Sequence, residues 1–353
     1  RARPAGAESL TPLGVHLAAL PVDPRIGKLT LLGAVFGVLD EALTIAAAIS
    51  SRSPFMSPPD QREAADAARR ELAAASGFAS DHLTLLHAYN CFEAERGEAK
   101  YAWARRHFLG VKTLQQMGAT KRQLLELLSD AGYAPSGLSA RRIESAGRAA
   151  GGTDGCREAL GQRAPAAGAA GLLPALLCAA LYPRVASVQH APQGKKGRGK
   201  SGGGGGGQAP KLFVRDPESG DPTPVAIHPS SVNARVTRFP HSYLVYHELV
   251  KTTKLYLRDT TPVPPLALLL LGAGSPEVDE REGDLNRPGG RGDDVTVCLG
   301  GWIKMRVPRR VLGLLMEARG RVEEVLRRKA ERPGERLFEG AWEIVEAVSR
   351  LVA

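Results

Sequence analysis

The chain has 353 residues, of which 43% are hydrophobic, 24% are charged and 5% are aromatic. This length is enough for about two or three small domains, and the composition excludes a largely disordered chain. The 47 Lys and Arg residues exceed the 37 Asp and Glu residues and give a formal net charge of +10. The charge therefore favours a polyanion such as nucleic acid as a partner, although it does not decide the function by itself.

The cysteines and the apolar runs limit the class of protein further. Four cysteines occur without a C-x2-C pair, which argues against a zinc ribbon and against a disulfide scaffold. The longest apolar run, Leu29 to Leu39, is far shorter than the ~20 residues of a membrane span. We therefore expect no membrane partner and an intracellular protein, with cytoplasm, nucleus and organelle left open. Arg1 to Ser9 carry no apolar signal segment, and we expect a fragment whose natural N-terminus lies upstream.

The N-terminal part of the chain reads mainly as helix. Leu10 to Gly14 predict a short strand and turn, and helix-like apolar spacing then continues to Ile49. A second helical region, Asp81 to Tyr133, begins after the N-cap candidate Ser80. Residues 147–171 are rich in Ala and Gly, so we expect a low-complexity loop there.

From residue 183 onward the apolar period drops to two, which is typical of strands. Short strands are predicted at 184–188, 211–215, 224–228, 243–251, 254–259 and 295–299. Five or six such strands predict a small barrel. A Gly- and Lys-rich segment at 191–210 and an acidic segment at 273–294 interrupt it, and we interpret both as insertions. The helical period returns at 309–353.

One motif suggests nucleotide binding. Residues 194–201 match the phosphate-loop pattern G-x-x-x-x-G-K-[ST] in full. A working phosphate loop follows a buried strand and opens a helix, whose N-terminal amides hold the phosphate. Here Pro192 precedes the motif and a run of glycines follows it, so we interpret the segment as a basic linker. An NTPase that uses Lys200 remains a weaker alternative.

Other catalytic signatures are missing from the sequence. It contains no H-E-x-x-H, no G-x-S-x-G and no paired carboxylates in a setting that would shift a pKa. The nearest cluster, His241 and Ser242 with His247 and Glu248, falls within an alternating strand, where a surface position is the favoured interpretation. We therefore predict no catalytic, cofactor-binding or metal-binding residue in this chain.

Nucleic-acid signals are better supported. In the strand at 254–258, period two puts Lys254, Tyr256 and Arg258 on one face. A basic and aromatic stripe on a small barrel is a common way to hold a single strand, although a solvated face explains this strand equally well. The turn at 228–233 is rich in donors that can meet phosphate oxygens or bond their own backbone.

Several blocks resemble, in order, the C-terminal region of the DEAH-box RNA helicases, in particular the RNA helicase A-like and quadruplex-resolving subgroup. Leu10–Gly14, Leu20–Lys28 and Leu43–Ala47 are similar to the second half of that family's winged helix, which leads into its helical bundle. Ser80–Leu83 and Ala88–Asn90 are similar to its ratchet-like helicase-associated bundle. His228–Asn233 and Tyr246–Thr253 are similar to its terminal OB-fold.

The resemblance implies a multidomain α+β fold, with a partial winged helix, a helical bundle, a small OB-type barrel and C-terminal helices. The divisions that we expect are 1–50 for the partial winged helix, 51–146 for the ratchet-like bundle, 147–171 for the low-complexity loop, 172–308 for the OB-fold with insertions at 191–210 and 273–294, and 309–353 for the C-terminal helices.

The resemblance also implies a function. In the family, these domains close over RecA-like motor domains to form a channel for single-stranded RNA. We therefore expect an accessory RNA-binding region of an ATP-dependent RNA helicase. Its ATP and Mg²⁺ belong to the motor, which this chain lacks, so the chain alone is expected to be inactive as an ATP hydrolase. The implied partners are single-stranded or structured RNA, the motor domains of the parent protein and a glycine-rich-patch activator. The alternative is a motorless RNA-binding or scaffold protein.

The resemblance places RNA contacts on the barrel, and these would meet phosphate and ribose because a translocating channel accepts every sequence. The implied contact residues are His228, Ser230, Asn233, His247, Lys251, Thr252 and Lys254. Asp81 and Asn90 match family positions in the bundle, where we favour a bracing role over RNA contact.

Overall fold

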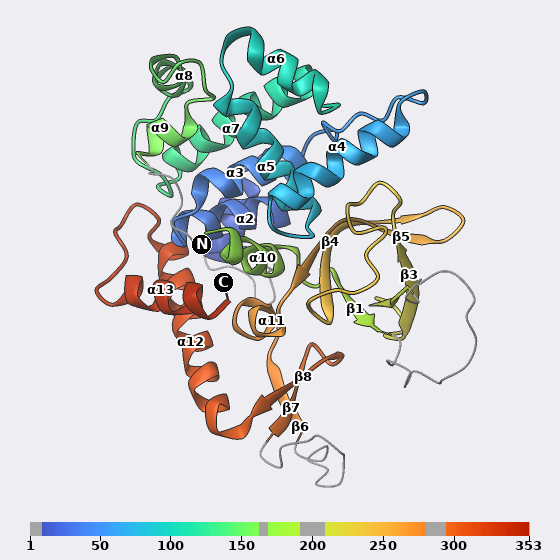
Figure 1. Cartoon of the computed structure of the whole chain (residues 1–353). Helices are drawn as coiled ribbons and strands as arrows, with labels where there is room; N and C mark the ends of the chain where they lie inside the picture. The colour runs from blue at the N-terminus through green and yellow to red at the C-terminus, as the bar shows by residue number, and fades with distance from the viewer. Residues whose placement is uncertain (1–8, 162–168, 191–208, 280–293, 353) are drawn as a thin grey trace, which may run out of the picture.

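The computed structural model describes residues 9–161, 169–190, 209–279 and 294–352. This part of the chain forms a helical bundle, a closed five-stranded barrel and a separate three-stranded sheet with two C-terminal helices (Figure 1). The predicted α+β class is therefore confirmed, while the domain boundaries stay predictions. The phosphate-loop motif at 194–201 lies outside the described residues.

The bundle occupies the N-terminal half of the chain. Its helices are α1 Pro12–Ala18, α2 Pro24–Val35, α3 Leu39–Ile49, α4 Arg62–Ala75, α5 Asp81–Ala94, α6 Gly97–Arg106, α7 Val111–Asp130, α8 Ala140–Ala149, α9 Cys156–Leu160 and α10 Ala169–Leu181. The hydroxyl of Ser80 caps α5 by accepting a hydrogen bond from the Leu83 N–H at 3.1 Å. The N-cap predicted at Ser80 is therefore confirmed.

The strand and turn predicted for residues 10–14 are wrong, because α1 begins there. The Thr11 hydroxyl accepts a hydrogen bond from the Gly14 N–H at 3.1 Å, and Pro12 occupies the first helical position. A Thr followed by Pro is a helix-start signal that the strand prediction overlooked. Residues 9–50 contain helices and no strand, and the partial winged helix expected for this region stays a prediction.

The described part of the loop predicted for residues 147–171 is only partly a loop, because residues 150–155 lie outside any helix and the flanking residues are helical. That part contains the end of α8, the whole of α9 and the first turn of α10. Its glycines permit close packing: a Cβ at Gly155 would lie 1.9 Å from the Ile143 carbonyl oxygen of α8. Cys156 at the start of α9 is fully buried. These glycines therefore let two helices approach each other, which composition alone cannot distinguish from a linker.

The barrel closes through the strand order β1-β2-β3-β5-β4, and its only parallel pair within the described residues is β3 with β5. Its strands are β1 Val185–Gln189, β2 Lys211–Arg215, β3 Pro222–Ile227, β4 Tyr243–Lys251 and β5 Leu255–Val263. Alternate apolar side chains fill the interior, including Val188, Leu212, Val214, Leu244 and Leu257. The predicted small barrel is therefore confirmed, and it has five strands.

The sixth predicted strand belongs to another sheet. Helix α11, Pro265–Leu271, follows β5 and turns the chain away from the barrel. The next strands, β6 Pro276–Asp279, β7 Asp294–Leu299 and β8 Ile303–Pro308, pair only with one another in the described structure. The helices α12 Arg309–Glu331 and α13 Ala341–Val352 complete the chain.

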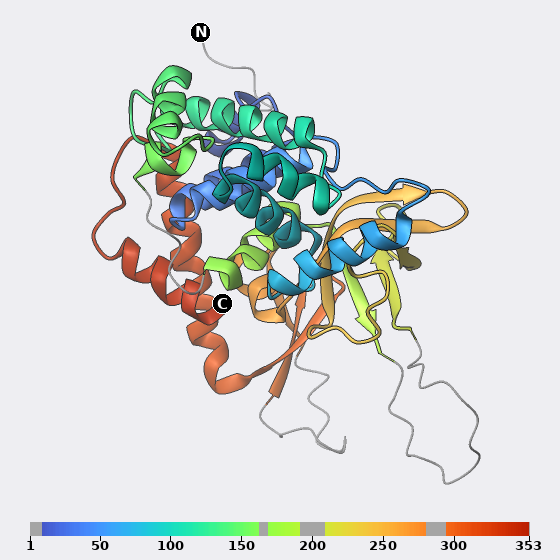
Figure 2. The same ribbon diagram turned by 45° about the horizontal axis from the view of Figure 1, so that its top comes forward.

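One apolar core joins these parts. It contains Leu32 of α2, Leu176 of α10, Val263 of β5, Leu268 of α11 and Val345 of α13, all buried. The turned view in Figure 2 places α4 beside the barrel, next to the β4–β5 hairpin. The bundle and the barrel therefore pack as one unit. Within the described residues, no helix has both the length and the hydropathy needed to cross a membrane.

Candidate nucleic-acid interface

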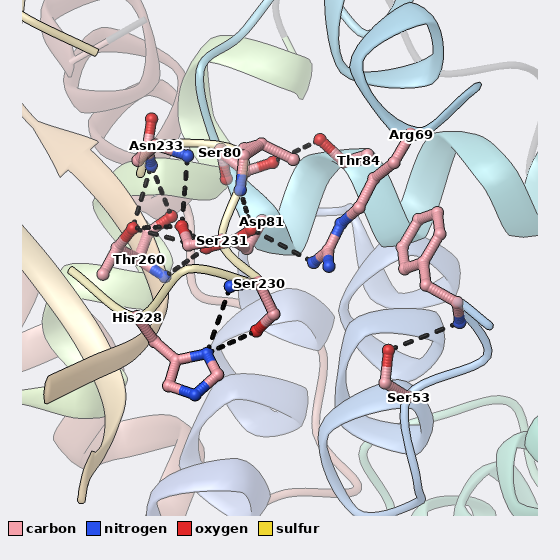
Figure 3. A network of polar contacts seen from close by, with 12 residues as sticks. Ser53, Arg69, Ser80, Asp81, Thr84, His228, Ser230, Ser231, Asn233 and Thr260 are labelled. Carbon is pink, nitrogen blue, oxygen red and sulfur yellow. Dashed lines mark hydrogen bonds and ion pairs between the residues drawn. The ribbon is translucent and has the colours of Figure 1, made fainter. Parts of the chain in front are cut away.

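Asp81, the first residue of α5, lies at the seam where the bundle meets the barrel (Figure 3). Its carboxylate is buried and accepts hydrogen bonds from the backbone N–H groups of Val232 and Thr260, both at 2.9 Å. The Ser231 hydroxyl also donates to it. The turn at 231–232 and strand β5 are thus both bonded to one carboxylate, and we call this set of hydrogen bonds the Asp81 clamp. The favoured bracing role fits this geometry.

Two neighbours of Asp81 extend the same contact. The Ser80 hydroxyl lies 2.6 Å from the Thr261 hydroxyl of β5, and Nδ1 of His82 lies 2.8 Å from that same oxygen. His82 is fully buried, and desolvation lowers its pKa to about 3, with a smaller contribution from His247. The ring is therefore neutral at physiological pH, and the start of α5 is held to β5 by uncharged as well as charged groups.

The turn at 228–233 follows β3 and separates into a surface part and a buried part. The His228 N–H donates to the Leu257 carbonyl at 2.9 Å, which continues the parallel pairing with β5. Ser230 is exposed and its hydroxyl lies 2.7 Å from Nδ1 of His228. Asn233 is 1% exposed, and its amide donates to the Thr260 hydroxyl at 2.9 Å. His228 and Ser230 can meet a ligand, whereas Asn233 braces the turn.

The tip of the β4–β5 hairpin carries the basic residues expected there. Lys251, Thr252 and Lys254 are exposed, and the Thr252 N–H donates to the Lys254 carbonyl at 2.9 Å to close the turn. His247 lies lower on β4 and is half-buried, and its carbonyl accepts a hydrogen bond from the Arg184 guanidinium. Burial and then the Arg184 charge lower the pKa of His247. It is therefore a neutral residue at the base of the hairpin, away from the cationic tip.

The predicted basic and aromatic stripe is present only in part. Tyr256 is half-buried and meets the His228 ring edge to face, with ring centroids 5.8 Å apart. Arg258 is exposed but lies 3.5 Å from the Glu248 carboxylate, which offsets its charge. Among the residues that the structure describes, Lys254 has no carboxylate partner, unlike Arg258, and Tyr256 packs against the turn.

Sequence reasoning did not identify Arg69 of α4, which lies next to these groups in Figure 3. Its guanidinium sits over the Phe55 ring at 4.5 Å from the centroid, and Nη2 is 3.4 Å from the Asp81 carboxylate. Burial, then the charges of Arg258 and Arg69, lower the pKa of His228. No motif marks Arg69, because only the folded chain brings α4 beside the turn.

A second buried polar cluster lies inside the bundle. The Lys121 ammonium is 2.6 Å from Asp40 and 2.9 Å from Asp154, and Tyr89 donates to Asp154 at 2.9 Å. Asn90, the other family-matched residue, is half-buried and lines a cavity beside this cluster. Among the described residues, no group of three or more His, Cys, Asp or Glu side chains could hold a metal ion. The cluster is a set of internal ion pairs.

Comparisons with known proteins fit this architecture. Residues 23–85 match the family "Helicase associated domain (HA2), ratchet-like", and residues 173–274 match "Oligonucleotide/oligosaccharide-binding (OB)-fold". Residues 295–353 match "C-terminal domain in RNA helicases". The OB-fold match contains all five barrel strands, and the third match begins in the separate sheet.

Individual relatives cover nearly the whole chain. The human "Putative ATP-dependent RNA helicase DHX57" is 42% identical over 92% of this chain and 23% of its own length. The Arabidopsis thaliana "DExH-box ATP-dependent RNA helicase DExH1" is 37% identical over 98% of this chain and 29% of its own. The bovine "ATP-dependent DNA/RNA helicase DHX36" is 35% identical over 92% and 28%. The chain thus spans about a quarter of these relatives, and it belongs to the C-terminal, helicase-associated region of the DEAH-box RNA helicases.

Proposed function

We propose that this chain is an accessory RNA-binding region that lines a single-stranded RNA channel and couples it to an ATP-dependent motor. The observation that carries the proposal is the exposed cationic hairpin tip, Lys251 to Lys254, on the same barrel edge as His228 and Ser230. The relatives' names, which describe RNA helicases, support the same function. Motor coupling, the partial winged helix and a glycine-rich-patch activator belong to the proposal as well.

The chemistry of this edge suits the RNA backbone. Ammonium and hydroxyl groups reach phosphate oxygens and ribose hydroxyls without reading base edges, so affinity would vary little with sequence. The one aromatic ring of the stripe, Tyr256, is half-buried and packs edge to face against His228. Salt-dependent, sequence-tolerant binding is therefore the expected signature.

The test is the double variant Lys251→Ala/Lys254→Ala, measured by fluorescence anisotropy with a single-stranded oligouridine of about ten nucleotides, the site size of an OB-fold. Each lost phosphate contact should lower the magnitude of the salt slope by ~0.7, so the pair should lower it by ~1.4. The affinity should fall to a similar extent for oligouridine and for a mixed sequence.

A matched control removes the same charge elsewhere. Arg141 and Arg148 are exposed on α8, which Figure 1 shows far from the barrel across the bundle. Arg141→Ala/Arg148→Ala should leave the salt slope unchanged. If the control weakens binding as much as the hairpin variant, only net charge matters and the proposed surface is wrong. If wild-type protein does not bind the oligonucleotide, the RNA-binding proposal itself fails.

A further inference from the structure

We infer that a cavity between helices α5, α6 and α7 of the bundle binds inorganic phosphate that still carries a proton. Helix α6 packs against both α5 and α7 (Figure 1), and the loop at 152–154 lines the cavity together with these helices. Its volume is about 220 Å³, below the ~300–1,000 Å³ of pockets for drug-sized ligands, so the occupant must be small. The lining comes from the bundle alone, so the inference does not rest on the proposed RNA-binding function.

Arg122 of α7 faces this cavity without an acid partner. Gln115, Gly118 and Arg122 follow one another at i, i+3 and i+7, so they lie on one face of α7, and all three line the cavity. An added Cβ at Gly118 would lie 3.7 Å from Nη1 of Arg122, so the guanidinium lies close over this glycine. Arg122 is half-buried and makes no hydrogen bond or ion pair to any residue that the structure describes. All of its N–H groups can therefore donate to a ligand.

Lys100 of α6 supplies a second cationic donor at the same cavity. Its ammonium lies 2.8 Å from Oε1 of Glu93 and 4.5 Å from the centroid of the Phe92 ring, and both residues belong to α5. Its contact with the Gly152 carbonyl is long, at 3.4 Å. An ammonium has three N–H donors, and within the described structure only the Glu93 contact has the length of a charge-assisted bond. Lys100 is therefore fixed in position and can still donate to a ligand.

The carboxylates that line the cavity are already bonded within the bundle. Oδ2 of Asp154 accepts hydrogen bonds from Tyr89 and Lys121, both at 2.9 Å, and Oδ1 accepts from the first backbone N–H of α9 at 2.8 Å. Oε1 of Glu93 accepts from the α6 ammonium, and Oε2 accepts from the Asp154 N–H at 2.7 Å. Neither acid is bonded to Arg122. An anion that reaches Arg122 therefore does not have to displace an existing ion pair.

Glu93 makes the cavity selective for an anion that carries a proton. A carboxylate oxygen has two lone pairs, and the bonds within the bundle use one on each Glu93 oxygen. The remaining lone pairs can accept an O–H donor, whereas they repel an anion that has none. Inorganic phosphate keeps a proton at neutral pH, sulfate has none, and a phosphate ester is mostly doubly ionised. Cationic donors on Arg122 and Lys100 with an acceptor on Glu93 therefore fit inorganic phosphate.

The first test is titration of the ¹⁵N-labelled chain with inorganic phosphate near pH 7 at constant ionic strength, followed by the amide NMR shifts of residues 152–154. These shifts should saturate, and sulfate should bind at least about tenfold more weakly. The hairpin variant Lys251→Ala/Lys254→Ala should bind phosphate as the wild type does. No saturable binding, equal affinity for sulfate, or loss of binding in the hairpin variant overturns the inference.

The second test removes the unpaired cation. Arg122→Gln should weaken phosphate binding about tenfold, because it removes a charge-assisted contact. The substitution breaks no hydrogen bond or ion pair among the described residues, so weaker binding would not reflect loss of folding. Arg141→Gln is the matched control, because Arg141 is exposed on α8, and it should change the affinity less than twofold. Equal affinities of the two variants would show that phosphate responds only to net charge and would overturn the site.

The third test concerns selectivity. Glu93→Gln should bring the affinities for phosphate and sulfate to within about twofold of each other, because an amide does not repel an anion as a carboxylate does. The amide oxygen can still accept one of the two bonds that Glu93 accepts, and circular dichroism checks that the variant folds. If Glu93 were only a structural residue, both affinities would change by the same factor, and that result would overturn its role in the site.

Discussion

Replacing Asp81 by Ala should weaken the contact between the barrel and the bundle more than the substitution of an exposed residue would. The substitution leaves the N–H groups of Val232 and Thr260 and the hydroxyl of Ser231 without their acceptor in a buried site. Each buried donor left unpaired costs about 1–3 kcal/mol, and loss of one member of a buried ion pair costs about 3–5 kcal/mol. Water that enters the space left by the removed carboxylate can bond some of these donors and so offsets part of the loss of stability. We therefore expect the free energy of unfolding to fall by about 3–5 kcal/mol.

Urea denaturation followed by hydrogen exchange can measure this loss and locate it. Peptides covering 228–233 and 257–263 should exchange faster in Asp81→Ala, because their amides lose protection when the clamp opens. Glu63→Ala is the control: Glu63 is an exposed acid in the first turn of α4, so its removal tests the helix-dipole contribution alone, about 0.5 kcal/mol. Equal stability of both variants, with unchanged exchange at the seam, would refute the clamp.

Three further substitutions follow from buried charges. Asp259 has a left-handed backbone (φ +52°), and burial raises its pKa to about 6, so the folded state disfavours its ionised form and stability falls as pH rises from about 4 to 6. Asp259→Asn should therefore raise the free energy of unfolding by up to about 3 kcal/mol at pH 7.5 and leave it unchanged near pH 4, as measured by urea denaturation. Asn tolerates this backbone conformation, so the substitution adds no strain. An equal gain in stability at both pH values would contradict the reasoning. Arg319→Met should cost about 3–5 kcal/mol, because its guanidinium bonds the carbonyls of Leu269 at 2.6 Å and Gly272 at 2.9 Å; an unchanged melting temperature would argue against this capping role. Lys121→Met should lower the free energy of unfolding by a similar amount, because the carboxylates of Asp40 and Asp154 stay buried without a cation. A urea midpoint equal to that of the wild type would contradict this cost and would show that the two carboxylates become protonated.

Strand positions followed well from local sequence, because a half-buried strand imposes an alternation that each segment carries by itself. The predicted strands at 211–215 and 243–251 coincide with β2 and β4. Membership of a sheet did not follow, because it depends on where the chain goes next. The strand at 295–299 forms within β7 but lies beyond α11, which directs it into the separate sheet.

The candidate site was predictable to the extent that its residues are marked by local chemistry. Lys251 and Lys254 stand in a short turn between alternating strands, and such turns are exposed. Asn233 has the same polar character, yet it is buried under Thr260 because the turn folds back onto β5. Arg69 is one of two adjacent arginines on α4, and only the position of α5 determines which of them faces Asp81. The sequence therefore shows which groups a polar residue can offer to a ligand, but tertiary contacts determine whether that residue is buried or exposed.

The way the seam is built bears on how the proposed motor coupling could work. Three successive residues at the start of α5, the N-cap Ser80 with Asp81 and His82, bond β5 or the adjoining turn, and all three are buried. Sliding the barrel over the bundle would break these bonds together and would also expose the shared apolar core, including Val263. Either cost exceeds the energy of a typical surface contact. If the hairpin tip binds RNA as proposed, a force applied there would be transmitted to α5 and the bundle, because the barrel and the bundle would move together.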